Sequence, residues 1–140
     1  MKKTSCYLLA FGIMMASCNT SKKEATNPFF SEFNTPHNVP AFDIIKTSDY
    51  MPAFERGIAE QKAEIAAIVA NTEAPTFANT IDQLERSGVI LNRVSNVFFN
   101  IKGTNKDVQI DSIAEVLTPI LSAHGSDINL NAGLFKRVKA

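Results

Sequence analysis

The sequence has no tryptophan, only two cysteines and only two histidines, and it has no excess charge of either sign. Its 14 basic and 14 acidic residues give a formal net charge of zero, which is not the electrostatic footprint of a protein that binds nucleic acid or an anionic surface. If Lys2 and Lys3 are removed with a leader, as argued below, 12 basic and 14 acidic residues remain, a net charge of −2. We therefore expect no nucleic-acid partner.

The short signatures of common catalytic sites are also missing, because the chain contains no HExxH, no CxxC and no G-x-S-x-G. His37 and His124 are far apart in the sequence, whereas a catalytic zinc site needs three protein ligands. We predict neither a catalytic residue nor a metal ligand in this chain. His124 is interpreted as a residue at a helix C-terminus, where the helix dipole favours it.

Polar side chains recur at helical spacing in three places. A general acid/base pair needs a pocket and a perturbed pKa, so carboxylates spaced four apart are interpreted as solvated surface charge. A row of amides either forms a polar flank of a helix or binds backbone groups of a neighbouring chain or peptide, and the polar flank is the preferred interpretation. These groups are Glu60 with Glu64, Asp107 with Asp111, and the row Asn92, Asn96 and Asn100.

The first eighteen residues, MKKTSCYLLAFGIMMASC, resemble a bacterial export signal. Two lysines precede an uncharged stretch over 7–16, which is too short to span a bilayer as a helix. Small residues, ending in Ser17, directly precede Cys18. This pattern resembles the lipobox of bacterial lipoproteins, with Met15 in the position usually held by leucine.

That resemblance implies cleavage between Ser17 and Cys18 and attachment of a diacylglyceryl group to the Cys18 thiol. Several acyl chains on one residue give stable attachment to a lipid bilayer. Cys6 is then discarded with the leader, so no internal disulfide is possible. The alternative is an ordinary cleaved signal in which the cysteine is incidental. We expect an exported, membrane-anchored lipoprotein that faces the periplasm or the cell exterior.

Three segments follow from this interpretation. Residues 1–17 are the signal, residues 18–27 are a polar, flexible tether, and residues 28–140 are a helical region.

Near the start of the helical region, over 27–45, three prolines exclude a long helix. We predict an extended arm there whose phenylalanine rings pack on the folded body, each contributing about 1.5–3 kcal/mol. These rings are Phe29, Phe30, Phe33 and Phe42.

Amphipathic helices are predicted over 48–71, over 76–103 and from residue 104 or 105 to Gly125. The second is interrupted at Ser87 and Gly88, where a kink or two helices meeting end to end are expected, and Gly103 is its candidate C-cap. A kink is expected at Pro119 in the third. The predicted buried stripes are Tyr50, Phe54, Ile58, Gln61, Ile65 and Ile68; Phe77, Ile81, Leu84, Leu91, Val94, Phe98 and Ile101; and Ile110, Ile113, Leu117, Ile120, Leu121 and His124.

A fourth helix is predicted to begin at Asn131, a good N-cap residue. Leu134, Phe135 and Val138 fall on one face of it, and the basic residues fall elsewhere. Either this helix docks on the preceding ones, or the chain is the front part of something longer. No pattern of paired strands is present, so the predicted fold class is all-α, with antiparallel amphipathic helices preceded by the aromatic arm.

Several stretches carry a resemblance to a known family over 27–140: VPAFDIIK, YMPAFERG, APTFANTIDQLERSG and VFFNI. They resemble the N-terminal region of bacterial peptidyl-dipeptidases of the Dcp type, which belong to the thimet oligopeptidase family of zinc metallopeptidases. Thr47 stands where many of these proteins have proline, a departure that leaves the helix start intact.

The resemblance implies the N-terminal part of a larger, two-lobed helical peptidase with a deep channel for short peptides. Its zinc, held by an HExxH helix and a downstream glutamate, belongs only to the full-length enzyme. None of those residues has a counterpart in this sequence. The chain is therefore expected to need the missing catalytic region as its partner and to be inactive alone. The alternative is a free-standing helical lipoprotein with a binding or structural role.

Overall fold

The computed structural model describes residues 26–105 and 107–140, which form helices and connecting segments with no strand among them. This confirms the all-α fold class. In chain order the elements are the short 3-10 turns η1 (Pro28–Phe30) and η2 (Pro36–Asn38), helix α1 (Thr47–Ala70), the π-helical turn η3 (Phe77–Ile81), and helices α2 (Asp82–Arg86), α3 (Val89–Thr104), α4 (Val108–Asn129) and α5 (Ala132–Lys139).

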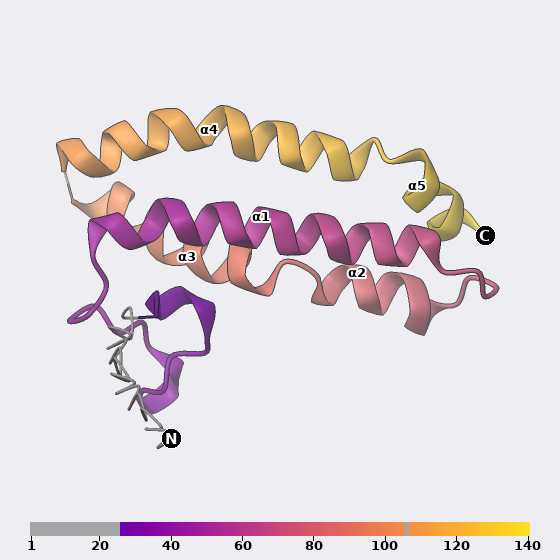
Figure 1. Ribbon diagram of the computed structural model, residues 1–140, viewed down its shortest axis with the longest axis horizontal. Helices are drawn as coiled ribbons and strands as arrows, with labels where there is room; N and C mark the ends of the chain where they lie inside the picture. Colours follow the sequence, from indigo (N-terminus) through magenta and orange to yellow (C-terminus); the bar gives the residue numbers. More distant parts are fainter. Residues whose placement is uncertain (1–25, 106) are drawn as a thin grey trace, which may run out of the picture.

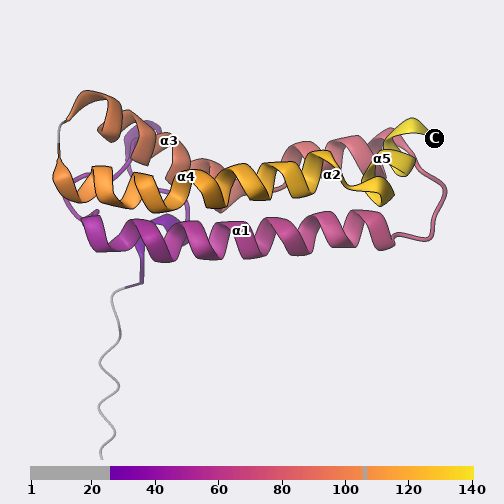
Figure 2. The same ribbon diagram turned by 90° about the horizontal axis from the view of Figure 1, so that it is seen from above.

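Helix α1 runs along the long axis of the molecule, with α2 and α3 end to end along one side of it and α4 along another (Figure 1). The view from above shows that these rows of helices follow the same axis (Figure 2). The arm that precedes α1 lies at one end, and α5 lies at the other (Figure 1). Helices α1 and α3 approach closely at Gly57, where a Cβ atom would lie 2.7 Å from the backbone nitrogen of Leu91.

A larger apolar cluster, called here the arm-end cluster, joins the arm to α1, α3 and α4. The Phe54 and Phe98 rings meet edge to face with centroids 5.5 Å apart, and Phe29 lies 5.5 Å from the Tyr50 ring. Arg93 of α3 donates a hydrogen bond of 2.8 Å to the carbonyl of Phe29, which fixes the arm backbone. The buried members are Phe29, Phe33, Tyr50, Ala53, Phe54, Val94, Val97, Phe98, Ile110, Ala114 and Leu117.

The predicted packing of the arm is confirmed for Phe29 and Phe33, which are buried. Phe30 is partly buried, and the Arg56 guanidinium lies 4.3 Å from its ring centroid. The prediction is wrong for Phe42, whose side chain is 57% exposed. A turn over 41–44 brings Ala41 and Ile45 to the cluster in its place.

A smaller apolar cluster, the α5-end cluster, lies at the other end of α1. Its buried members Ile65, Ile68 and Leu134 pack with Val69, Leu84 and Ile128. Asn131 caps α5 as predicted, because its side-chain oxygen accepts a 2.9 Å hydrogen bond from the Leu134 backbone nitrogen.

The predicted apolar face of α5 is partly wrong. Phe135 and Val138 are 65% and 46% exposed, whereas Arg137, three residues after Leu134, is buried. Leu134 and Arg137 share a face one turn apart, and that face lies against α1 and η3. The exposed part of α5 is therefore both apolar and basic.

Two glycines predicted to end helices lie inside them. Helix α3 continues through Gly103 to Thr104, and α4 continues through Gly125 to Asn129. Among the described residues only Gly88 is a glycine with a positive φ, +73°, the backbone conformation in which glycine ends or interrupts a helix. Helix α4 starts later than predicted, because the side chain of Asp107 caps it at Val108, and it runs through Pro119 without a break.

Most residues of the predicted buried stripes are buried or partly buried, with two clear exceptions. Phe77 is 74% exposed and Ile120 is 42% exposed. In the wide π-helical turn of η3 the buried position belongs to Thr80, which is 1% exposed. On α4 the buried residues are Ile110, Ala114, Leu117 and His124. His124 is therefore buried within a helix that continues to Asn129, and it is not a C-terminal residue.

Candidate functional site

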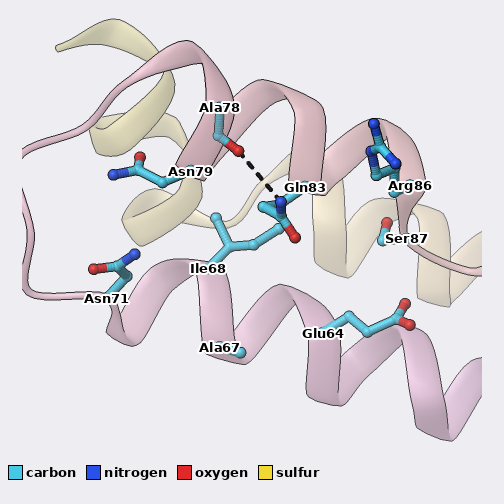
Figure 3. Close-up of a pocket in the computed structure, with 9 residues that line it drawn as sticks. All are labelled: Glu64, Ala67, Ile68, Asn71, Ala78, Asn79, Gln83, Arg86 and Ser87. Atoms are coloured by element: carbon cyan, nitrogen blue, oxygen red, sulfur yellow. Dashed lines mark hydrogen bonds between the residues drawn. The ribbon is translucent and has the colours of Figure 1, made fainter.

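A groove of about 570 Å³ separates the C-terminal half of α1 from η3 and α2 (Figure 3). It lies beside the α5-end cluster, since Ile68 belongs to both. Its lining combines apolar and amide side chains with one carboxylate and one guanidinium. The lining residues are Glu64, Ala67, Ile68, Asn71, Ala78, Asn79, Gln83, Arg86 and Ser87.

Most polar atoms of this groove already have partners within the fold. Gln83 donates a 3.3 Å hydrogen bond to the carbonyl of Ala78 across one turn (Figure 3). The Glu64 carboxylate accepts a 2.7 Å hydrogen bond from the backbone nitrogen of Gly88, and the Ser87 hydroxyl donates to the Leu84 carbonyl at 2.7 Å. The groove therefore offers apolar contact and hydrogen bonding, and none of its lining residues forms a nucleophile–base pair.

Arg137 of α5 closes a network at one end of the groove. Its guanidinium donates to the carbonyl of Asn71 at 2.5 Å, to the carbonyl of Glu73 at 3.2 Å and to the side-chain oxygen of Asn79 at 3.1 Å. The first two carbonyls follow the last turn of α1, where free carbonyl groups and the helix dipole favour a cation. Arg137 thus fixes α5 to the end of α1 and to η3 through neutral acceptors.

A second polar constellation, the central polar layer, links α4, α1 and the break between α2 and α3. His124 Nε2 lies 2.7 Å from Gln61 Oε1, Gln61 Nε2 donates to Ser87 Oγ at 3.2 Å, and Ser87 donates onward to the Leu84 carbonyl. Because Gln61 presents its oxygen to the imidazole, Nε2 donates this hydrogen bond, and in the neutral imidazole Nδ1 is then the unprotonated nitrogen. Nδ1 is buried and has no hydrogen-bond partner among the described residues.

Burial of the imidazole lowers the pKa of His124 below its ordinary value of 6.5, because the charged form loses its hydration. The positive charge of Lys62 lowers this pKa further, and the negative charge of Asp127 opposes the shift. His124 is consequently neutral near pH 7.

The predicted lipidation and cleavage residues, Ser17 and Cys18, lie outside the described residues. The same holds for residues 1–17 and for most of the predicted tether over 18–27. The lipid anchor therefore stays a prediction. None of the described helices is both long and apolar enough to cross a membrane.

The two histidines lie in different environments. His37 is exposed in η2 and has a φ of 60°, whereas His124 is 4% exposed inside α4. Within residues 26–105 and 107–140, no three His, Cys, Asp or Glu side chains are grouped so that they could hold a metal ion. The residues present do not fit a zinc centre, and we assign no zinc ligand to them.

Each predicted carboxylate pair is divided between separate partners. Glu60 bonds to Arg56 at 2.7 Å, whereas Glu64 binds the backbone of Gly88. Asp107 caps α4, and Asp111 lies 3.7 Å from the Lys102 ammonium group. The four carboxylates therefore stabilise helix ends, the helix break and surface pairs.

The amide row on α3 bonds largely to itself. Asn96 donates to the side-chain oxygen of Asn92 at 3.1 Å, and Asn100 donates to the carbonyl of Asn96 at 2.6 Å. All three residues are exposed, as expected for a polar flank of a helix.

Sequence reasoning missed the roles of Gln61, Ser87 and Arg137. A signal for the first was present, because Gln61 and His124 each fall within an otherwise apolar stripe. A polar residue in such a stripe is buried and needs a partner. The spacing of three from Leu134 placed Arg137 next to a residue expected to face inward, but the apolar pattern favoured Phe135 and Val138 for that face.

Comparison with known proteins gives a clear relationship, although no protein-family model matches the chain. The dipeptidyl carboxypeptidase of Salmonella typhimurium is 40% identical over 116 residues, which cover 83% of this chain and 17% of that protein. The chain is similar to one part of a dipeptidyl carboxypeptidase. The Escherichia coli dipeptidyl carboxypeptidase is also 40% identical, over 114 residues, covering 81% of this chain and 17% of that protein.

A weaker similarity extends to oligopeptidase A of Salmonella typhimurium, which is 22% identical over 110 residues, covering 79% of this chain and 16% of that protein. The chain thus spans less than a fifth of the length of the dipeptidyl carboxypeptidases and of the oligopeptidase that it matches. These matches support the resemblance to a region of peptidyl-dipeptidases inferred from the sequence.

Proposed function

We propose that this chain forms the N-terminal helical region of a zinc-dependent peptidyl-dipeptidase that degrades short peptides outside the cytoplasm. The observation that carries the proposal is the 40% identity over 116 residues to a dipeptidyl carboxypeptidase. The zinc ligands and the catalytic glutamate belong, in this proposal, to a part of the enzyme that the 140 residues do not include. The described helices contribute one wall of the peptide channel.

The 140-residue chain has, in this account, no peptidase activity of its own. The described residues contain no nucleophile–base pair in the groove and no grouping that fits a metal ion. The purified chain, incubated with zinc and a short peptide, is expected to release no dipeptide detectable by mass spectrometry. Zinc-dependent release by the pure chain would place the catalytic groups within these residues and contradict the proposal.

A chimera tests the proposed role directly. The matched 116 residues of the Salmonella typhimurium dipeptidyl carboxypeptidase are replaced by the corresponding residues of this chain. If the two regions are equivalent, kcat/KM for a short peptide falls by no more than about tenfold, a loss of about 1.4 kcal/mol of transition-state stabilisation. The control is the same enzyme with this region deleted. A chimera that melts cooperatively but is as inactive as the deletion would show that the regions are not equivalent.

The lipid anchor is a separate proposal that rests on the sequence MMASC before residue 19. Acylated Cys18 attaches the protein to a bilayer and places it outside the cytoplasm. Cells that express the chain are grown with an alkyne analogue of palmitate, and lipid attachment is detected on a gel. Cys18→Ser is expected to abolish labelling, whereas the matched Cys6→Ser variant retains it. Labelling that survives Cys18→Ser would exclude Cys18 as the attachment site.

A further inference from the structure

The central polar layer lies between the two apolar clusters on every helix row that it joins. Each polar position of the layer has, along the sequence, a residue of one cluster before it and a residue of the other cluster after it. These positions are Gln61, the Ser87–Gly88 break and His124. The arm-end and α5-end clusters are therefore not continuous with one another. The flanking residues are Phe54 and Ile65 on α1, Leu84 and Leu91 around the break, and Leu121 and Ile128 on α4.

We propose that this layer is a pH-responsive latch. While His124 is neutral, the layer holds α4 and the α2–α3 break against α1. When His124 takes up a proton, the α5 end of the molecule opens, and the arm end stays closed. The opening end carries both walls of the groove, because α1, η3 and α2 line it.

The hydrogen bonds of the layer provide no acceptor for a second proton on the imidazole. The chain from His124 through Gln61 to Ser87 ends at a backbone carbonyl, so its donors and acceptors run in one direction. A second proton would have to sit on Nδ1, which is buried without an acceptor among the described residues. A buried N–H without a partner and an uncompensated charge are both unfavourable.

The charged groups around the layer do not compensate for such a proton. Lys62 of α1 and Asp127 of α4 lie 3.6 Å apart, both largely exposed, and act on His124 with opposite sign. Glu64 of α1 is occupied by the backbone nitrogen of Gly88. Arg86 of α2 is exposed and paired with Asp82 at 2.9 Å.

The direction of the pH effect follows from the lowered pKa of His124 in the closed state. In the open state the imidazole regains its ordinary pKa of 6.5, so the open state binds the proton first. The latch is fully stable above pH 6.5 and loses stability as the pH falls below it. One proton changes the opening equilibrium by at most about tenfold per pH unit.

Hydrogen exchange of the 140-residue chain measures this opening region by region. Between pH 7.5 and pH 5.5, after correction for the intrinsic exchange rates, protection in α5 and in η3 with α2 is expected to fall about three- to tenfold. Protection in α3 and in the first half of α1 is expected to change less than twofold. An equal loss at both ends, or no loss at the α5 end, would overturn the latch.

Three variants connect the effect to the imidazole. His124→Gln is expected to remove the pH dependence, whereas His37→Asn, which alters the exposed histidine, is expected to leave it unchanged. Gln61→Glu places a carboxylate against Nε2 and raises the pKa of His124, so protection at the α5 end should rise as the pH falls below 7. A His37→Asn variant that loses the effect, or a Gln61→Glu variant that keeps its sign, contradicts the proposal.

Because a variant at a buried position can fail to fold, the unaltered chain supplies a second test. NMR titration of the imidazole nitrogens follows His124, and the sequence has only one other histidine from which its signals must be separated. We expect His124 to titrate below its ordinary value of 6.5 and to carry its neutral-state proton on Nε2. A His124 that titrates at or above pH 6.5, or that carries its proton on Nδ1, rejects the latch.

Discussion

Gly88 lies directly over the side chain of Gln61, and a Cβ atom at Gly88 would be only 2.5 Å from Gln61 Nε2. Gly88 also has a φ of +73°, in the left-handed region where other residues are strained. The same glycine donates its backbone nitrogen to the Glu64 carboxylate. The break between α2 and α3 is therefore held by two side chains of α1, and it fits no residue other than glycine without rearrangement.

Gly88→Ala is expected to destabilise the fold by about 2–3 kcal/mol, from left-handed strain of about 1–2 kcal/mol and a weakened Gln61 hydrogen bond. The matched control is Gly125→Ala, because a Cβ at Gly125 would meet no atom within 4 Å. That substitution lies inside α4 and is expected to stabilise it by about 0.5–1 kcal/mol. Urea unfolding of the 140-residue chain, followed by helical circular dichroism, measures both, and equal effects would refute this explanation.

Arg137→Met is expected to destabilise the packing of α5 by about 2–3 kcal/mol, because charge-assisted hydrogen bonds are lost and partly buried carbonyls are left without a donor. The Asn71 and Glu73 carbonyls and the Asn79 side chain lose their shared donor. Lys136→Met, on the exposed side of the same helix, is the control and should change stability by less than about 0.5 kcal/mol. A variant at Arg137 that unfolds at the same urea concentration as the Lys136 variant would show that the network contributes nothing.

The arm provides a third comparison between two phenylalanines. Phe29 is fully buried in the arm-end cluster, so Phe29→Ala is expected to cost about 3–5 kcal/mol. Phe42 lies only 13 residues later in the sequence but is 57% exposed, and Phe42→Ala should cost about 0.5 kcal/mol or less. Similar unfolding midpoints for the two variants would indicate that the arm is not part of the cooperative fold.

The positions of the main helices were predictable from the sequence, because helix formation and capping depend on residues close together in the chain. The stripe that contains Tyr50, Phe54, Ile65 and Ile68 predicted α1 to within a residue or so, and Asn131 predicted the start of α5. The break at Ser87–Gly88 was also expected, because two poor helix formers interrupt good ones.

What was missed depends on contacts between distant segments. The sequence predicts helix ends at Gly103 and Gly125, but a glycine ends a helix where the backbone turns to positive φ, which composition alone does not reveal. His124 was assigned to a helix terminus, and its burial depends on Gln61, 63 residues earlier. The π-helical turn of η3 shifted the register of its face, so Thr80 became buried and Phe77 exposed.

The proposed function makes this chain one region of a larger peptidase, and the size of the native product tests that claim most directly. An antibody raised against residues 55–71 is used to blot membranes from the cells that express the gene. We predict a band several times larger than the 15.3 kDa of the 140-residue chain, since the matched residues make up 17% of the related enzymes. A band near 15 kDa, with no larger product, would contradict the account and leave a small helical protein whose role is binding or structural.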